Sequence, residues 1–150
     1  NLLTKLKLSA KLPNNLIITP HPGEASRLLN KSIDEIESNR FKAVSLLQEK
    51  FNCVAVLKGS GTLVCYKKGG KQKIGVCEAG NPGMASGGMG DILTGIITGF
   101  LAQGLNLIEA AELGVDIHAK AADLKSLETG EAGLLASDVL EEVRQLLKYE

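Results

Sequence analysis

The chain has 150 residues, a length that suits a single domain with a buried core. Its 17 Lys and Arg residues balance its 17 Asp and Glu residues, and aromatic residues make up only 3% of the chain. The neutral balance excludes a basic surface of the kind that binds nucleic acid, and the few aromatic residues argue against platforms for stacked bases.

Strand-like and helix-like patterns alternate along the first part of the chain. The expected elements are a helical apolar pattern at 2–6, a short buried strand at 16–19, one or two helical turns at 23–29, a helix from Ser32 to about Lys50 and a strand at 53–57. Ser32 and Glu35 have the spacing of a capping box, which predicts where the longer helix begins. The continuous apolar run at 53–57 is typical of a strand in the middle of a parallel sheet.

The second part of the chain begins with strands and then becomes helical. The expected elements are two strands at 62–66 and 72–76, a Gly-rich loop, a buried helix ending at Gly104, a helix from Asn106 to about Leu127 and a helix from a Ser137 cap to the C-terminus. Asn106 and Glu109 have the spacing of a second capping box. The two strands are joined by a turn-rich segment and form a hairpin near the sheet edge. The whole pattern predicts an α/β fold with a mostly parallel sheet and an edge hairpin.

Cysteine usage and hydropathy indicate the compartment. Cys53, Cys65 and Cys77 are odd in number, lack a C-x-x-C pair and lie in or beside strand-like runs, which predicts buried, reduced thiols in a cytoplasmic protein. No secretory leader is visible. The longest uncharged run, 92–108, contains polar residues and three glycines, so it is expected to be a core helix with its exit loop and not a membrane span.

The run NPGMASGGMGD at 81–91 is the clearest functional signal in the chain. Its glycines supply bare backbone N–H groups and close approach to a ligand, and the loop opens directly into a helix whose positive dipole end favours an anion. The expected anion donors are the N–H groups of Gly87, Gly88, Met89 and Gly90. Asp91 stands at the mouth of this site, where a carboxylate can act as base on a hydroxyl that receives a phosphoryl group. The alternative is a plain helix start in which Asp91 compensates the dipole.

Two further polar segments follow predicted strands. In TPHPGE at 19–24, two prolines fix the direction of His21, which favours a ligand contact over a rigid turn with an incidental histidine, and Glu24 is expected to cap the next helix. KGSGT at 58–62 is either a tight turn or a phosphate-binding loop with Lys58 as a nearby positive charge. Ligands collect at the carboxyl ends of strands in an open α/β sheet, so all three segments are expected to face one site.

The sequence offers no metal-binding motif. No His, Cys and Asp cluster has the spacing of a zinc site. His118 lies within an apolar helical pattern and is expected to be a packed or surface histidine. No dedicated carboxylate cage is visible for Mg²⁺, which is usual for an ion that phosphates hold.

The segments at 19–24, 58–62 and 80–91, with the ILTGII continuation at 92–97, resemble the NAD(P)H-hydrate dehydratases, a family of ribokinase-like repair enzymes. The resemblance covers nearly the whole chain from Leu16 onward, and HPGE combined with GGMGD is similar to the bacterial and archaeal ADP-dependent branch. It implies a three-layer αβα ribokinase-like fold. It also implies a lyase that returns NADH hydrate or NADPH hydrate to the working cofactor and releases AMP and phosphate from ADP.

The resemblance further implies a role for individual residues. Asp91 is implied to be the catalytic base and to contact the hydrate, which His21 helps to hold. The residues implied to hold the ADP or AMP are Lys58, Gly59, Ser60, Gly61 and Thr62, with Gly90 also in contact. Mg²⁺ is the implied cofactor, ADP the phosphoryl donor, and small molecules the implied partners, with no nucleic acid and no membrane.

The chain is shorter than the domain of the family it resembles. We therefore expect residues 1–150 to be the C-terminal portion of a single ribokinase-like domain that lacks its N-terminal half, and this leaves activity of the isolated piece open. The loss of strands would expose a sheet edge and an apolar face. That predicts association with the missing half or with other copies, and the resemblance implies a homo-oligomer, a tetramer in the family.

Two other functions stay open at this point. A ribokinase-like small-molecule kinase, for example one acting on a vitamin precursor, would share the anion loop and Asp91 but end with a stable phosphorylated product. A catalytically incomplete nucleotide-binding fragment would bind ADP or AMP without turnover. The HPGE motif and the positions of Met84 and Met89 favour the dehydratase over the kinase.

Overall fold

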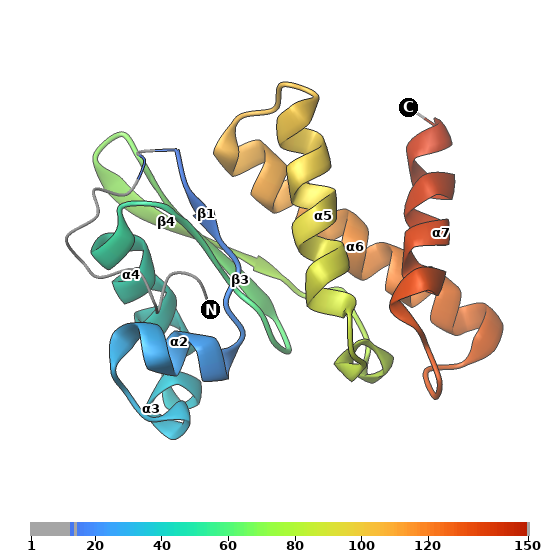
Figure 1. Ribbon diagram of the computed structural model, residues 1–150, viewed down its shortest axis with the longest axis horizontal. Helices are drawn as coiled ribbons and strands as arrows, with labels where there is room; N and C mark the ends of the chain where they lie inside the picture. Colours follow the sequence, from blue (N-terminus) through green and yellow to red (C-terminus); the bar gives the residue numbers. More distant parts are fainter. Residues whose placement is uncertain (1–12, 14, 150) are drawn as a thin grey trace. The chain divides into compact units, whose positions relative to one another are not determined.

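The computed structural model describes residue 13 and residues 15–149 (Figure 1). The chain divides into two compact units, Asn1–Val76 and Cys77–Glu150, and each is described by itself. The helical pattern expected at 2–6 lies outside the described residues.

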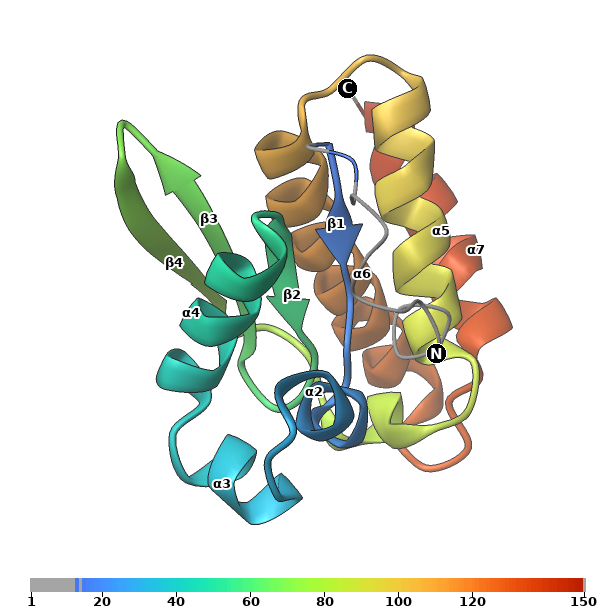
Figure 2. The same cartoon turned by 60° about the vertical axis from the view of Figure 1, so that its left-hand side comes forward.

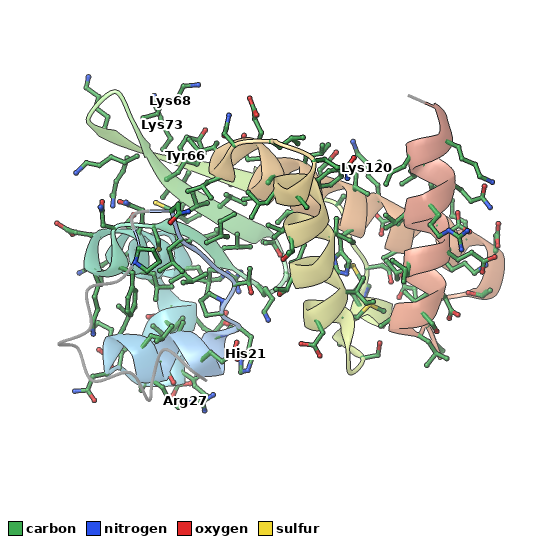
Figure 3. The ribbon with its side chains drawn as sticks, turned by 45° about the horizontal axis from the view of Figure 1, so that its top comes forward. His21, Arg27, Tyr66, Lys68, Lys73 and Lys120 are labelled. Atoms are coloured by element: carbon green, nitrogen blue, oxygen red, sulfur yellow. The ribbon has the colours of Figure 1, made fainter. Side chains whose placement is uncertain are left out.

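The first unit is built on a four-stranded sheet. Its strands are β1 (Ile17–Ile18), β2 (Val54–Leu57), β3 (Thr62–Lys68) and β4 (Lys71–Cys77), in the order β1-β2-β3-β4. The β1–β2 pair is parallel and the β2–β3 pair is antiparallel, so the sheet is mixed. The two expected hairpin strands are present as β3 and β4, and β4 lies at the sheet edge, which confirms the edge hairpin. Figure 3 shows Lys68 and Lys73 on this hairpin.

The described residues of the first unit also form the helices α2 (Pro22–Leu29), α3 (Ile33–Ser38) and α4 (Arg40–Phe51). The Ser32–Glu35 capping box is present, with both of its hydrogen bonds formed. The single helix expected from Ser32 to Lys50 is wrong, because Asn39 divides it. Asn39 leaves the helical region at φ −150° and ψ 77°, and its side chain accepts from the Lys42 N–H at 2.9 Å, so it ends one helix and caps the next.

The core of the first unit lies between α4 and one face of the sheet (Figure 2). The antiparallel register pairs Ala55 with Cys65, so both side chains stand on the same face. Val44 and Leu47 of α4 belong to the same buried cluster. All four residues of β2 are buried, as its continuous apolar sequence predicts for a strand covered on both faces.

The second unit is helical over its described residues. It contains the short 3-10 helix η1 (Pro82–Ala85), the helices α5 (Met89–Ala102), α6 (Leu107–Thr129) and α7 (Ala136–Leu146), and the terminal turn η2 (Leu147–Tyr149). The helix α6 packs against both α5 and α7 (Figure 2). At Gly114 of α6 an added Cβ would lie 2.6 Å from Cγ1 of Ile97, so the absence of a side chain there lets α5 approach closely.

Of the two helix caps predicted for the second unit, the one at Asn106 is present and the one at Ser137 is not. Asn106 caps α6, and its side chain accepts from the N–H groups of Ile108 and Glu109. The prediction that Ser137 caps the last helix is wrong, because α7 begins at Ala136 and its N-cap residue is Leu135. The Asp138 carboxylate accepts from the Leu135 N–H at 2.9 Å, and a leucine side chain has no acceptor to offer in return.

The cysteines are free thiols, as expected for reduced side chains. Cys53 and Cys65 are buried and Cys77 is half-buried. Burial, with a smaller contribution from the neighbouring Cys65, raises the pKa of Cys53 to about 12, so this thiol is inert at neutral pH. Across the described part of the chain, no helix combines the length and apolar character needed to cross a bilayer.

Candidate functional site

His21 stands at the beginning of α2, where Figure 3 shows it. Its Nδ1 accepts from the Gly23 N–H at 3.1 Å, and the Glu24 carboxylate accepts from the His21 N–H at 2.9 Å. The histidine therefore caps its own helix, and Glu24 completes the box as expected from the sequence. Because Nδ1 is an acceptor, the neutral ring carries its proton on Nε2. The His21 side chain is 53% exposed.

Glu24 joins two of the segments that the sequence singled out. Its Oε2 lies 3.6 Å from Nε2 of His21 and 3.8 Å from Nζ of Lys58. The backbones meet as well, since the Lys58 N–H donates to the Pro20 carbonyl at 2.9 Å. Burial raises the pKa of Glu24, but the hydrogen bond from the His21 backbone and the charges of His21 and Lys58 outweigh it and lower the pKa below its ordinary 4.5. Glu24 is thus a carboxylate at neutral pH.

The loop at 58–62 takes its shape from Arg40, the first residue of α4. Nη2 of Arg40 lies 3.4 Å from the carbonyl oxygens of Leu57 and Lys58 and 3.3 Å from that of Gly61. Nothing in the sequence around residue 40 distinguishes this arginine from a solvated one. Its role in shaping the loop is therefore visible only in the folded chain.

The glycines of this loop adopt conformations that other residues rarely reach. Gly59 has φ +142° and Gly61 has φ +67°. The Thr62 hydroxyl donates to the Gly59 carbonyl at 3.2 Å and so closes the loop. That hydroxyl hydrogen is used within the loop, which leaves the backbone N–H groups and the Ser60 hydroxyl as its outward donors.

In the second unit, the beginning of the Gly-rich loop is anchored by Asp123 of α6. The Asp123 carboxylate accepts from the Gly80 N–H at 2.8 Å and from Nδ2 of Asn81 at 2.9 Å. Oδ1 of Asn81 in turn accepts from the Gly83 N–H at 3.1 Å. These bonds fix the turn η1, and the two that Asp123 accepts join residues 43 and 42 positions apart.

The end of the Gly-rich loop is the first turn of α5. Gly88 is the N-cap, with φ +89°, and its carbonyl accepts from the N–H groups of Asp91 and Ile92 at 3.0 Å each. The helix begins at Met89, three residues earlier than the sequence suggested. In the part of the chain that the structure describes, no acceptor is present for the N–H groups of Met89 and Gly90.

The Asp91 side chain is exposed in that first turn, beside the free N–H groups. The Met89 side chain is only 4% exposed and packs in the core, so Met89 offers its backbone and not its thioether. The first turn of α5 therefore places one exposed carboxylate next to two N–H groups that have no acceptor among the described residues.

His118 of α6 lies beneath this helix start. It is 5% exposed and hydrogen-bonds the Met89 backbone, while its Nε2 has no partner among the described residues. Burial lowers the pKa of His118 to about 4, and the bond with Met89 opposes that shift only partly. His118 is a neutral, packed histidine, one of the two environments that the sequence left open for it.

The described residues contain no group of three or more His, Cys, Asp and Glu side chains that could hold a metal ion. The first unit brings His21 and Lys58 together through Glu24, and the second unit brings Gly87, Gly88, Met89, Gly90 and Asp91 together at the start of α5. The first group contains a Gly-rich loop with a lysine, and the second contains a helix N-terminus with a carboxylate.

A family model described as NAD(P)H-hydrate dehydratase matches residues 1–145. The chain belongs to the NAD(P)H-hydrate dehydratase family. Among the members of that family, the bifunctional NAD(P)H-hydrate repair enzyme Nnr of Vibrio cholerae is 56% identical over 131 residues, which are 87% of this chain and 26% of that protein. The ADP-dependent (S)-NAD(P)H-hydrate dehydratase of Neisseria meningitidis is 43% identical over 133 residues, which are 88% of this chain and 44% of that protein.

A solved structure of the family shares the fold. The crystal structure of the ADP/ATP-dependent NAD(P)H-hydrate dehydratase from Bacillus subtilis, co-crystallised with ATP and Mg²⁺, matches with a TM-score of 0.82 at 29% identity. The match covers 89% of this chain and 47% of that one. It confirms the expected ribokinase-like α/β fold. The chain spans 26% to 47% of the length of these three relatives.

Proposed function

We propose that this member of the dehydratase family converts NADH hydrate or NADPH hydrate back to the reduced cofactor and splits ADP into AMP and phosphate. The observation that carries the proposal is the start of α5. There the exposed Asp91 carboxylate stands beside N–H groups of Met89 and Gly90 that have no acceptor within the described residues. A base next to anion donors is what phosphoryl transfer to a hydroxyl requires.

We assign the nucleotide to the loop at 58–62. Gly59 and Gly61 allow the backbone to approach a phosphate, and the Ser60 hydroxyl and the Lys58 ammonium supply further donors. The AMP portion of ADP is proposed to lie on Lys58, Gly59, Ser60, Gly61 and Thr62, with Gly90 as an additional contact. The relative from Neisseria meningitidis is named ADP-dependent and the one from Bacillus subtilis ADP/ATP-dependent, which supports an adenine nucleotide, here ADP, as the donor.

We assign the hydrate to His21 and Asp91. Asp91 takes the proton of the ring hydroxyl as that oxygen attacks the β-phosphorus of ADP, and AMP leaves. The phosphate then leaves the ring carbon, a ring proton is released and the double bond returns. The sum is hydrate plus ADP giving reduced cofactor, AMP and phosphate. The protonated Nε2 of His21 is proposed to donate a hydrogen bond to the hydrate.

Mg²⁺ fits this proposal as an ion held mainly by the phosphates. The described residues offer no cage for it, and Mg²⁺ commonly binds through one or two carboxylates and the substrate phosphates. Asp91 is assigned to the substrate hydroxyl, so the phosphates of ADP and water would supply the ligands of this ion. The ion supplies neutralisation of charge on the phosphoryl group during transfer.

We further propose that these residues act as the C-terminal portion of one ribokinase-like domain in the cytoplasm. The chain spans less than half of each relative named above, and β1 lies at one edge of the described sheet. On α6, Leu124 and Leu127 are 42% and 83% exposed. An open edge and exposed apolar side chains support association with the remainder of the domain or with other copies.

The test supplies the full-length protein with NADH hydrate, ADP and Mg²⁺ and follows the absorbance of reduced nicotinamide together with AMP and phosphate. We expect one AMP and one phosphate for each cofactor restored, and no rise without ADP. A stable phosphorylated product without release of phosphate would instead identify a small-molecule kinase. Binding of AMP without any turnover would identify a nucleotide-binding module.

A further inference from the structure

The Arg40 guanidinium is turned into the 58–62 loop and not toward solvent. Its side chain is only 16% exposed. Besides its three carbonyl contacts, its Nη1 lies 3.4 and 3.5 Å from the two carboxylate oxygens of Glu37. A Cβ added to Gly59 would collide with the guanidinium, so the backbone of Gly59 lies directly against it. A planar fork that reaches several carbonyls of one loop is a geometry that suits arginine.

These contacts determine which way the loop amides face. No cis peptide bond is present among the described residues, and in a trans peptide the N–H points opposite to the C=O of the same unit. The carbonyls of Lys58 and Gly61 point to Arg40. The N–H groups that follow them, on Gly59 and Thr62, therefore point away from it.

The remaining polar groups of the loop support the same orientation. The Gly59 carbonyl is taken by the Thr62 hydroxyl, and the Lys58 N–H is taken by the Pro20 carbonyl. In the described residues no backbone acceptor is present for the N–H groups of Gly59, Ser60 and Gly61. The Gly59 N–H is thus without a backbone acceptor and points away from the Arg40 cation, where it can donate to an anion.

We propose that Arg40 is a positioning residue for the nucleotide: it holds the carbonyls of the 58–62 loop so that the loop amides face the phosphate of the bound AMP. The inference rests on the proposed function, which assigns the nucleotide to this loop. Arg40 acts through the loop and does not touch the ligand. Its charge, behind the peptide units, also favours an anion on their far side.

The experiment uses the full-length protein and three variants. Arg40→Met removes the fork, and Arg40→Lys keeps the charge but has no planar set of donors. Lys50→Met is the matched control, because Lys50 lies on the same helix and donates to a different backbone carbonyl, that of Leu28, at 2.7 Å. The readouts are the AMP dissociation constant by calorimetry, KM for ADP, KM for NADH hydrate, and kcat.

We expect R40M to raise the AMP dissociation constant and KM for ADP about 10-fold, the size of a lost charged hydrogen-bond set, with kcat and KM for the hydrate within about twofold. R40K should give about a threefold increase and K50M no change. If R40M or R40K binds AMP with the wild-type affinity, the inference about Arg40 is overturned and the proposed function is not affected. Equal losses in every kinetic constant would also overturn it, since they indicate a general structural role.

Two further outcomes separate this inference from the proposed function. If R40M does not fold, R40K decides, because a lysine at the first turn of α4 keeps both the charge and the helix. If the wild-type protein itself fails to bind AMP, the assignment of the nucleotide to this loop is wrong, and the role of Arg40 is overturned with it.

Discussion

The two Gly-rich loops of this chain present backbone amides by different means. The loop at 58–62 is shaped from outside, by Arg40 on a neighbouring helix and by the ion pair of Lys58 with Glu24. The loop at 80–91 is held at its beginning by Asp123 of α6, and its last residues are the first turn of α5. A helix start adds the positive end of its dipole to its amides, whereas a turn between strands offers only its amides and any cation nearby.

The two loops also differ in how their supports respond to pH. In the loop at 80–91, the Met89 backbone is hydrogen-bonded to the buried, neutral His118. In the loop at 58–62, Lys58 forms an ion pair with the Glu24 carboxylate. Because the ordinary pKa values of the two groups differ, acid should weaken the second unit before the first. Four changes sharpen or break this contrast.

The largest expected effect is the acid sensitivity set by His118. In the unfolded chain this histidine takes up a proton near pH 6.5, whereas in the folded chain it does so only near pH 4. The stability that it contributes is therefore complete above pH 6.5 and falls as the pH drops toward 4, by about 3 kcal/mol in total. Urea unfolding at several pH values should show this slope in the wild type and not in His118→Gln. A slope that persists in the variant would contradict the assignment.

The Asp123 anchor should come next. In Asp123→Asn, one carboxylate oxygen is replaced by an NH₂ group, which cannot accept from the Gly80 N–H or from Nδ2 of Asn81. We expect the free energy of unfolding to fall by about 1–3 kcal/mol. Asp116→Asn is the control on the same helix, because Asp116 forms an exposed pair with Lys120 and should cost less than about 1 kcal/mol. Thermal unfolding of both variants measures the difference. Equal losses would mean that Asp123 does not anchor the loop.

The adjacent glycines Gly87 and Gly88 should differ in how well they tolerate a side chain. Gly88→Ala forces a left-handed backbone on alanine and brings its Cβ to 3.3 Å from that of Ala136, so it should cost about 1–2 kcal/mol. Gly87→Ala has no neighbour within 4 Å in the described structure and should leave stability within about 0.5 kcal/mol. Chemical denaturation compares the two. If G87A keeps its stability but loses activity, residue 87 approaches a ligand; an equally stable G88A would refute the cap geometry.

The smallest expected effect is that of Glu24. Because its folded pKa is lowered, the stability it contributes is present above the ordinary value of 4.5 and is lost as the pH falls through the folded value. Glu24→Gln should lower stability at pH 7 by about 0.5–1 kcal/mol and remove this acid-dependent loss. Unfolding curves at pH 7 and pH 3.5 test it. A variant with the wild-type loss in acid would exclude Glu24 as its source.

The sequence predicts features that depend on neighbours in the chain. The Ser32 capping box, the Asn106 cap and the edge hairpin are local, and all three are present. The sequence-based prediction of helix starts failed where more than one nearby residue could cap the helix. Asn39 interrupts a helical pattern by capping a new helix, and Asp138 supplies the capping carboxylate of α7 one residue after the expected Ser137.

The supports of the two loops were not predictable in this way. Arg40 lies 17 to 21 positions from its carbonyl partners, and Asp123 lies 42 and 43 positions from its own. No spacing rule connects residues so far apart, because the connection exists only once the helix packs beside the loop. The motifs themselves, at 19–24, 58–62 and 80–91, were visible because their glycines and prolines have few other uses.

The most direct test compares Asp91→Asn with the wild type in one sample set, by AMP binding and by the initial rate of NADH restoration. If the first loop holds the nucleotide and Asp91 is the base, D91N should bind AMP with unchanged affinity and restore NADH about 10²–10⁴ times more slowly. A D91N protein that restores NADH at the wild-type rate would contradict the assignment of the base. One that loses AMP affinity in parallel with its rate would contradict the division of work between the two loops.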